Sequence, residues 1–301
     1  MPVRLTVLVP GGSGQLGRDF AALASDSVDV IAPGSAELDV TATGQVLAAV
    51  GALADRARET GSAPVVVNAA AYTAVDAAET DEDRAFAVNA DGPRVLAAAC
   101  ASRRVPLIHV STDYVFAGDA STPYEPLDEL GPRTAYGRTK AAGEDAVLGS
   151  GASSWVVRAG WLYGHTGSNF VKTMTALESS RPELSVVDDQ IGGPTWTADL
   201  AAGLLELASR VAAGDGPERR ILHCANTGSV SWCGFAKAIF SRLGADPSRV
   251  HPCTTEEFPR PAPRPAYSVL SPASWQEAWL TPLRPWEEAL DAYFKARSVP
   301  A

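Results

Sequence analysis

The sequence has no excess of positive charge. Its 301 residues include 25 lysines and arginines against 35 aspartates and glutamates, which gives a net charge of −10. Because nucleic-acid binding depends on clustered Lys and Arg contacts to phosphate, we expect no nucleic-acid partner. A small anionic ligand is compatible with this charge, since a few backbone amides and local cations can bind a phosphate group in an acidic protein.

Long apolar runs are also absent. No stretch reaches the ~18 apolar residues that a membrane-spanning helix needs, so we expect no membrane partner. The apolar run at 3–9 is too short for a signal peptide and leads directly into a glycine-rich turn, which favours a cytoplasmic location.

Cysteines are few and widely spaced. No two of them stand in a CxxC pattern, and the four are Cys100, Cys224, Cys233 and Cys253. We therefore expect reduced thiols of a cytosolic protein rather than disulfides or a zinc site.

What the chain does contain is a regular alternation of apolar runs and Ala-rich stretches, with 46 % hydrophobic and 20 % charged residues overall. The pattern predicts strands at 3–9, 28–32, 65–68, 107–111 and 154–158. It predicts helices at 15–24, 43–59, 81–103, 136–148, 197–213 and 231–243, and a proline-rich loop at 258–266. Continuous apolar strands that alternate with helices indicate an α/β fold, a Rossmann-type doubly wound parallel sheet covered on both faces.

The second half of the chain is less regular and predicts a smaller C-terminal substrate-binding lobe. We expect it to cover the strand ends, where open α/β sheets bind ligands. The predicted dinucleotide-binding domain is 1–163 together with 197–226, and the predicted lobe is discontinuous, at 164–196 and 227–301.

A glycine-rich turn follows the first predicted strand and opens a helix. It reads GGSGQLG from Gly11 to Gly17, with Gly14 between them. Glycines allow a sharp turn and close approach of a pyrophosphate to a helix N-terminus, so this context favours dinucleotide binding over a merely flexible turn.

The strand at 28–32 ends without an acidic residue. An acid there normally binds the adenosine ribose and repels a 2′-phosphate, so its absence favours NADPH, with NADH as the alternative. Ser35 or Arg18 could touch that phosphate; a turn of no consequence is an equal interpretation.

Tyr136 and Lys140 are spaced by four residues, which puts both on one face of a predicted helix. An ammonium beside the phenol, with an oxidised nicotinamide nearby, is expected to lower the pKa of Tyr136 from about 10 towards the working pH. Such a tyrosine could protonate a carbonyl oxygen during reduction, helped by a hydroxyl at the end of strand 107–111. By itself this spacing is common on surface helices, but together with the glycine-rich turn it indicates a catalytic pair.

At this point the chain resembles the extended short-chain dehydrogenase/reductases, and within them the dTDP-4-dehydrorhamnose reductase family. The resemblance rests on GGSGQLG (11–17), NAAAYTAVDAAE (68–79), VSTDYVFAG (110–118), YGRTKAAGE (136–144), RAGWLYG (158–164), VVDDQIGGPTWTADLA (186–201), CANTGSVSW (224–232) and RPAYSVL (264–270). It covers nearly the whole chain. The second and sixth motifs are specific to this family rather than to the superfamily.

The resemblance implies roles for individual residues. The implied cofactor contacts are Gly11, Gly14, Gln15, Leu16, Gly17, Asp39, Val40, Ala71, Tyr72, Thr73, Val110, Tyr136 and Lys140. The implied catalytic residues are Thr112, Tyr136 as proton donor and Lys140, and the implied substrate contacts are Thr112, Asp113, Tyr136 and Trp161. Without the resemblance, Trp161 is read as a core aromatic, and Asp113 equally well as a turn or capping carboxylate.

The implied reaction is transfer of hydride from NADPH to C4 of dTDP-4-dehydro-β-L-rhamnose, giving dTDP-β-L-rhamnose. Alternatives are a related nucleotide-sugar reductase or epimerase that makes another deoxysugar, and a non-catalytic NADP-binding regulatory subunit. The expected partner is a dTDP-activated keto-sugar, and the expected state is a monomer or a homodimer. No metal is expected: the tyrosine and threonine can polarise the carbonyl, and the acidic residues that bind Mg²⁺ in some family members cannot be matched here.

Overall fold

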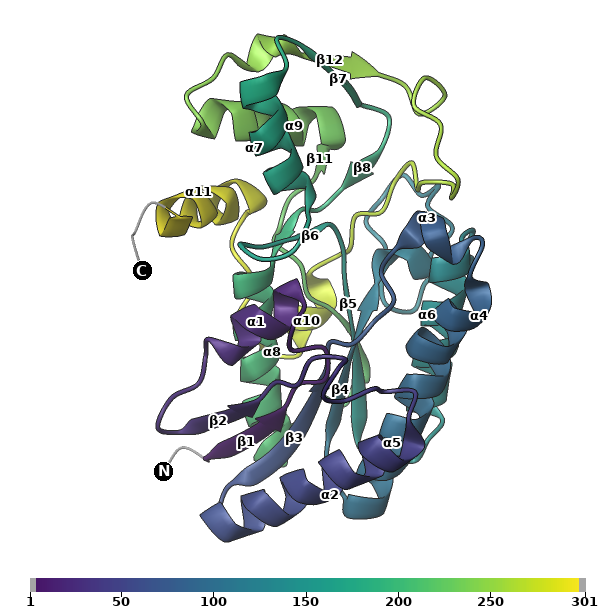
Figure 1. Cartoon of the computed structure of the whole chain (residues 1–301), viewed down its shortest axis with the longest axis vertical. Helices are drawn as coiled ribbons and strands as arrows, with labels where there is room; N and C mark the ends of the chain where they lie inside the picture. Colours follow the sequence, from purple (N-terminus) through teal and green to yellow (C-terminus); the bar gives the residue numbers. More distant parts are fainter. Residues whose placement is uncertain (1–3, 298–301) are drawn as a thin grey trace.

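A parallel six-stranded sheet lies at the centre of the computed structural model, which describes residues 4–297 (Figure 1). The strand order is β10-β5-β4-β3-β1-β2. The strands are β1 (Leu5–Leu8), β2 (Val28–Ile31), β3 (Ala63–Asn68), β4 (Leu107–Thr112), β5 (Ser154–Ala159) and β10 (Ile221–His223). The first five overlap the five predicted strands; residue 3 of the first lies outside the described residues.

Helices cover both faces of this sheet. One face carries α1 (Gln15–Ala21), α8 (Thr197–Ala212) and α10 (Ala273–Glu277), which share a buried core with β1, β3 and β5. The opposite face carries α2 (Thr43–Thr60), α5 (Gly92–Arg103) and α6 (Ala135–Leu148), with a second buried core. Burial on both faces explains why the strand sequences are apolar without alternation. The predicted doubly wound α/β fold is therefore confirmed.

The predicted helix 81–103 is wrong in one respect, because it is interrupted. The structure has α4 (Glu82–Phe86), a π-helical turn (Ala87–Asp91) and then α5. Pro93 in the first turn of α5 has no N–H to donate to the preceding turn. The π turn buries Asn89, whose side chain bonds both backbone groups of Tyr72 and the hydroxyl of Thr139. The interruption thus fastens the loop after β3 to α6.

The smaller lobe stands above the carboxyl ends of the strands (Figure 1). It contains α7 (Phe170–Ser180), α9 (Trp232–Arg242) and α11 (Trp286–Arg297), which share a core of their own. Its short strands pair as β6 (Leu162–Tyr163) with β9 (Thr195–Trp196), β7 (Leu184–Val187) with β12 (Val250–Cys253), and β8 (Ile191–Gly192) with β11 (Val230–Ser231). The remaining elements are α3 (Val75–Ala78) and 3₁₀ turns at Asp113–Val115 and Pro247–Arg249.

The predicted division of the chain stays a prediction, but the packing departs from it at one place. Within 197–226, β10 is a strand of the main sheet and α8 packs on its face. The range 227–301 was assigned wholly to the lobe, yet Trp275 and Leu280 pack in the core of the main sheet. The helix α10 is too short for a helical pattern of apolar residues, so the sequence does not show that this segment packs on the main sheet. None of the helices within 4–297 is long and apolar enough to cross a bilayer.

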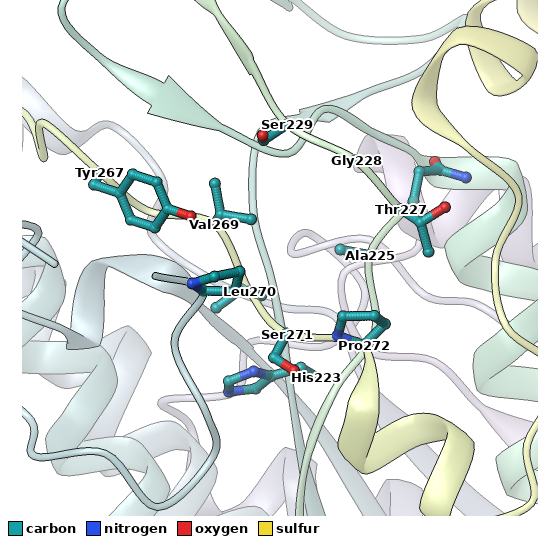
Figure 2. A pocket seen from close by; sticks show the side chains of 12 residues that line it. His223, Ala225, Thr227, Gly228, Ser229, Tyr267, Val269, Leu270, Ser271 and Pro272 are labelled. Carbon is teal, nitrogen blue, oxygen red and sulfur yellow. The ribbon is translucent and has the colours of Figure 1, made fainter. Parts of the chain in front are cut away.

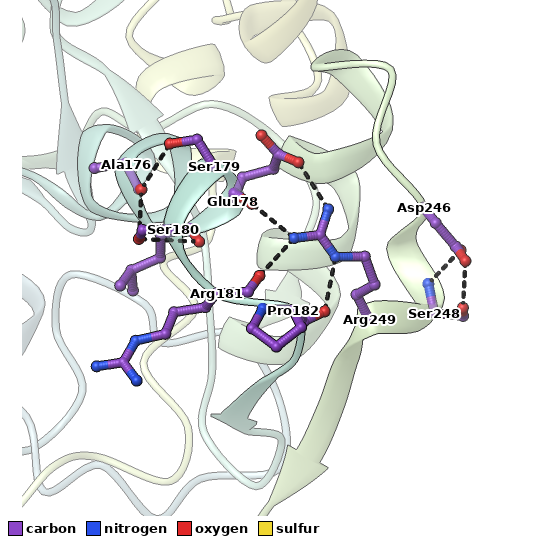
Figure 3. Close-up of polar contacts among 10 residues, drawn as sticks. Ala176, Glu178, Ser179, Ser180, Arg181, Pro182, Asp246, Ser248 and Arg249 are labelled. Carbon is purple, nitrogen blue, oxygen red and sulfur yellow. Dashed lines mark hydrogen bonds and ion pairs between the residues drawn. The ribbon is translucent and has the colours of Figure 1, made fainter.

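Arg249, the residue before β12, binds the C-terminal end of α7 (Figure 3). Its guanidinium bonds the Glu178 carboxylate at 2.7 Å and the backbone carbonyls of Glu178, Arg181 and Pro182 at 2.6, 2.5 and 2.8 Å. These carbonyls lie at and just beyond the C-terminus of α7, where no intrahelical N–H can reach them. One side chain therefore caps α7 and ties it to β12.

We expect Arg249→Ala to lower the free energy of unfolding by about 2–3 kcal/mol, because several charge-assisted hydrogen bonds are lost together. The measurement is urea unfolding followed by tryptophan fluorescence. Arg181→Ala is the matched control, since the Arg181 guanidinium points away from this cluster (Figure 3). Equal stability of the two variants would contradict the capping role of Arg249.

Candidate active site

A cavity of about 540 Å³ opens at the carboxyl ends of the strands, between the sheet and the smaller lobe. It spans the reversal of strand order between β1 and β3, the place where open α/β sheets bind ligands. The predicted site residues on its wall are Gly11, Gly14, Gln15, Leu16, Gly17, Asp39, Val40, Ala71, Thr73, Val110, Thr112, Asp113, Tyr136, Lys140 and Trp161. The volume falls within the range of ligand pockets.

Tyr72 is the predicted contact that the structure does not bring to the cavity wall. Its backbone is held by Asn89, and its ring packs near Ala78 and Ala85. Tyr136 packs against the same small cluster. Asn89, the residue responsible, was not found from the sequence, because no motif marks a buried amide inside a helix.

The glycine-rich turn has the shape that the sequence predicts. Gly11 has φ +87°, and a Cβ on Gly12 or Gly17 would lie 1.9 Å from the Ala32 carbonyl oxygen or 2.4 Å from the Gly11 carbonyl oxygen. Gly14 differs: it faces the cavity, and its Cβ would meet only the Gly11 oxygen at 3.2 Å. The turn thus leaves a bare backbone cradle at the start of α1, which fits a pyrophosphate.

The loop after β2 forms the far end of the cavity. Ser35 lines it, and the Glu37 carboxylate accepts a 2.8 Å hydrogen bond from the Gly34 amide. Two hydrogen bonds from Thr41 lower the pKa of Asp39, which also lines the cavity. Arg18 does not line it, but its guanidinium bonds the carbonyl of neighbouring Ser13 at 3.0 Å.

Tyr136 reaches the cavity because α6 packs closely on the loop after β4. Thr134 caps α6 by accepting the Gly137 amide at 2.9 Å. A Cβ on Gly137 would lie 2.3 Å from the Tyr114 carbonyl oxygen, so only glycine permits this approach. The approach brings the Tyr136 phenol to the same cavity wall as Thr112, at the end of β4.

Among the protein groups around Tyr136, burial has the largest effect on its pKa. Burial raises the pKa of Tyr136 to about 12, although the Thr112 hydroxyl opposes the shift. The Lys140 ammonium donates to the Val110 carbonyl at 2.7 Å. The phenol therefore keeps its proton at neutral pH, and the lowering expected beside an oxidised nicotinamide stays a prediction.

Lys140 lies in a buried polar network. Its side chain is 1 % exposed, and its Nζ is 3.4 Å from Nε2 of His109, whose Nδ1 lies 3.0 Å from the Asn68 amide nitrogen. Burial lowers the pKa of Lys140 to about 8, and the Glu144 carboxylate opposes the shift. Burial and nearby Lys140 keep the pKa of His109 well below its ordinary value. Neither His109 nor Asn68 was predicted as a site residue.

One turn beyond Lys140, a buried ion pair fixes α6 to the sheet. Arg158 of β5 and Glu144 of α6 are 1 % and 2 % exposed in their side chains and meet at 2.6 Å. Arg158 Nε also bonds both Glu144 oxygens, and Nη1 donates to the Pro126 carbonyl. The pair thus leaves little of its hydrogen-bonding capacity unused, as a buried pair requires.

Trp161 forms the part of the wall nearest the smaller lobe. Its ring stacks face to face on Trp232, with centroids 3.4 Å apart and planes at 1°. Its φ is +50°, and a Cβ on Gly192 would lie 2.2 Å from Cε2 of the indole. The indole is clamped by the lobe while it still lines the cavity.

A second hollow of about 160 Å³ lies between residues 225–229 and 267–272 (Figure 2). None of the predicted site residues lines it. His223 forms part of its wall, and burial lowers the pKa of His223 to about 3, so the ring is neutral. Tyr267 brings a phenol to its wall, but no lysine lines it and no glycine-rich turn borders it, whereas the larger cavity combines all three.

The chain is similar to known proteins along nearly its whole length. The model of the family described as RmlD substrate binding domain matches residues 5–299. A dTDP-4-dehydrorhamnose reductase of Mycobacterium tuberculosis is 47 % identical over 290 residues, covering 94 % of this chain and 90 % of that protein. A probable dTDP-4,6-dihydroxy-2-methyloxan-3-one 4-ketoreductase of Streptomyces antibioticus is 48 % identical, covering 95 % and 94 %. The solved dTDP-4-dehydrorhamnose reductase of Bacillus anthracis in complex with NADP has a TM-score of 0.87 at 36 % identity, covering 97 % and 99 %.

The glycine-rich turn yields a paired prediction. Gly14→Ala should weaken NADPH binding about tenfold or more, because its methyl group would stand in the cradle, and should leave the melting temperature nearly unchanged. Gly12→Ala should instead lower the melting temperature by roughly 5 °C or more, since its methyl group meets backbone. Fluorescence titration and thermal melting separate the two. Unchanged NADPH affinity in Gly14→Ala would remove the cradle interpretation.

Proposed function

Since this chain belongs to the dTDP-4-dehydrorhamnose reductase family, we propose that it reduces the C4 keto group of dTDP-4-dehydro-β-L-rhamnose with NADPH. The product is dTDP-β-L-rhamnose, and the activity belongs to deoxysugar biosynthesis. The observation that carries the proposal is the convergence of Thr112, Tyr136 and Lys140 on the same cavity as the glycine-rich turn. A regulatory subunit without activity would have no need to retain this set.

The cofactor fits the residues on the cavity wall. The bare cradle at Gly11–Gly17 suits the pyrophosphate, and Asp39 and Val40 are assigned to the adenine end. The end of β2 bears no acid, and Glu37 is engaged by the Gly34 amide, which supports NADPH over NADH. Ala71, Thr73 and Val110 are assigned to the nicotinamide side and Lys140 to the ribose hydroxyls. When bound, NADPH supplies the hydride.

Tyr136 is assigned the proton transfer. It donates its phenolic proton to the keto oxygen, and its raised pKa ensures that this proton is present at working pH. Thr112 is assigned a second hydrogen bond to the same oxygen. Lys140 carries its charge below its pKa of about 8 and stabilises the phenolate that Tyr136 becomes. The substrate contacts assigned beside these are Asp113 and Trp161.

A second candidate function is reduction of a different dTDP-activated keto-sugar. The relative from Streptomyces antibioticus, named for such a substrate, is as similar to this chain as the rhamnose enzymes are. Both reductions would use the same residues, because both transfer a hydride to a keto group. Comparing kcat/KM for the two sugar nucleotides decides between them.

We place the enzyme in the cytoplasm, because the four cysteines are all free, as in a reducing compartment. The cavity is built from a single chain, so the proposal holds for a monomer and a homodimer alike.

Tyr136→Phe keeps the ring and its packing but removes the transferable proton. Turnover of dTDP-4-dehydrorhamnose, followed by NADPH absorbance, should fall by roughly 10²–10⁴-fold while NADPH affinity barely changes. Lys140→Met should reduce both turnover and NADPH affinity, since one side chain serves the phenol and the ribose. Near-normal turnover by Tyr136→Phe would eliminate this mechanism, and no turnover by the unmodified enzyme would eliminate the substrate.

Trp161→Ala tests the substrate side of the cavity. It should raise KM for the sugar nucleotide about 10–100-fold, which corresponds to the ~1–3 kcal/mol of a packed indole, and leave the NADPH Kd within about twofold. Kinetics and calorimetric titration measure the two. If cofactor affinity falls equally, or the variant unfolds, Trp161 is a core residue and not a substrate contact.

A further inference from the structure

Asp113 is a buried acid that forms no ion pair with any residue of 4–297. Its side chain lines the cavity, yet the residue is only 2 % exposed, and Oδ2 has no hydrogen-bond partner within 4–297. Gly160 gives it room: a Cβ there would lie 2.8 Å from Cγ and from Oδ2. A buried carboxylate that lacks both a cation and a full set of donors is costly to ionise.

The groups that face Asp113 come from every element around it, and none of them is a cation. They are the hydroxyls of Thr112 and Ser268 and the phenols of Tyr114 and Tyr136. Lys140 is turned to the Val110 carbonyl, and Arg264 is paired with Asp76 at 2.8 Å. Consequently burial raises the pKa of Asp113 to about 6, although hydrogen bonds from Ser268 and Thr112 oppose it.

Thr112 has one hydroxyl hydrogen, and it donates this hydrogen to Asp113 in a hydrogen bond. Thr112 Oγ1 donates to Asp113 Oδ1 at 3.0 Å and accepts from the Tyr114 amide at 3.2 Å. A hydroxyl that donates to Asp113 has no further hydrogen to offer, only a lone pair. In this state Thr112 cannot donate to a keto oxygen.

We propose that Asp113 controls whether Thr112 helps to polarise the substrate's carbonyl group. While Asp113 is ionised, it holds the Thr112 hydroxyl hydrogen. When Asp113 carries a proton, its O–H donates to Thr112 Oγ1, and the Thr112 hydrogen turns to the keto oxygen. Asp113 is thus a positioning residue that acts through Thr112. This inference rests on the proposed reductase function and adds a regulatory acid to it.

The first test is the pH dependence of kcat. In the unmodified enzyme kcat should fall about 10–30-fold as the pH rises from about 5 to 7.5, because the protonated fraction of Asp113 falls by about that factor and a donor to the developing oxyanion is withdrawn with it. Asp113→Asn, and Asp113→Ala in which no acceptor remains, should each lose this fall. Thr112→Val should be slow at every pH and also lack it. Asp119→Asn, which changes an exposed acid in the same loop, should keep the unmodified profile.

The second test uses stability and needs no substrate. The pKa of Asp113 in the folded protein, about 6, lies above the ordinary 3.8, so folding strengthens proton binding. The resulting stability is fully present below a pH of about 4 and is lost as the pH rises through about 6. The melting temperature should therefore fall more between about pH 4 and pH 7 in the unmodified protein than in Asp113→Asn.

The outcomes separate this inference from the function on which it rests. A fall in kcat that persists in Asp113→Ala, or parallel melting curves of the unmodified protein and Asp113→Asn, would overturn the role of Asp113. Absence of turnover at all pH values would overturn the proposed function, while the melting comparison would still decide whether Asp113 binds a proton in this range.

Discussion

The buried pair of Arg158 and Glu144 is the contact on which the site depends. It joins β5 to α6 one turn beyond Lys140, in a region from which water is excluded. Two buried charges are stable only when each satisfies the other, so the pair permits one register of α6 against the sheet. That register places Tyr136 at Thr112 and Lys140 at Val110. Glu144 also acts on Lys140 directly, since it opposes the loss of its charge.

The electrostatics of the cavity follow from the same exclusion of water. Burial keeps the phenol of Tyr136 protonated, brings the pKa of Lys140 close to neutral pH and makes Asp113 a weak acid. Each shift disfavours a charge. Of the three, the Tyr136 phenol is the group that stays uncharged at neutral pH, so it can donate to a keto oxygen on which charge develops.

The sequence predicts what depends on local pattern. Five strands of the sheet are predicted correctly because both of its faces are buried, which makes each strand a short, continuous apolar run. Tyr136 and Lys140 line the same cavity, and a spacing of four along a helix predicts that they share a face. The glycine-rich turn was found because the steric demands at Gly12 and Gly17 leave no alternative residue.

What the sequence did not predict depends on contacts between distant segments. The π turn exists because Asn89 bonds Tyr72 and Thr139. The residues next to Asn89 in the sequence do not indicate these partners. The direction of the Tyr136 pKa depends on how deeply the phenol is buried and on where the Lys140 ammonium points. Neither can be read from the spacing of Tyr136 and Lys140 along the chain.

The clamp on Trp161 limits how this protein can change over evolutionary time. Any side chain at Gly192 would collide with the indole of Trp161, so position 192 cannot enlarge while the tryptophan is present. Replacing Trp161 first would uncover the face of Trp232 on which it is stacked. Positions 161 and 192 can therefore be substituted only together, or one after the other through a less stable variant. A descendant protein that binds a different sugar must pass through such a less stable variant, or keep Trp161 and Gly192 and change other residues of the cavity wall.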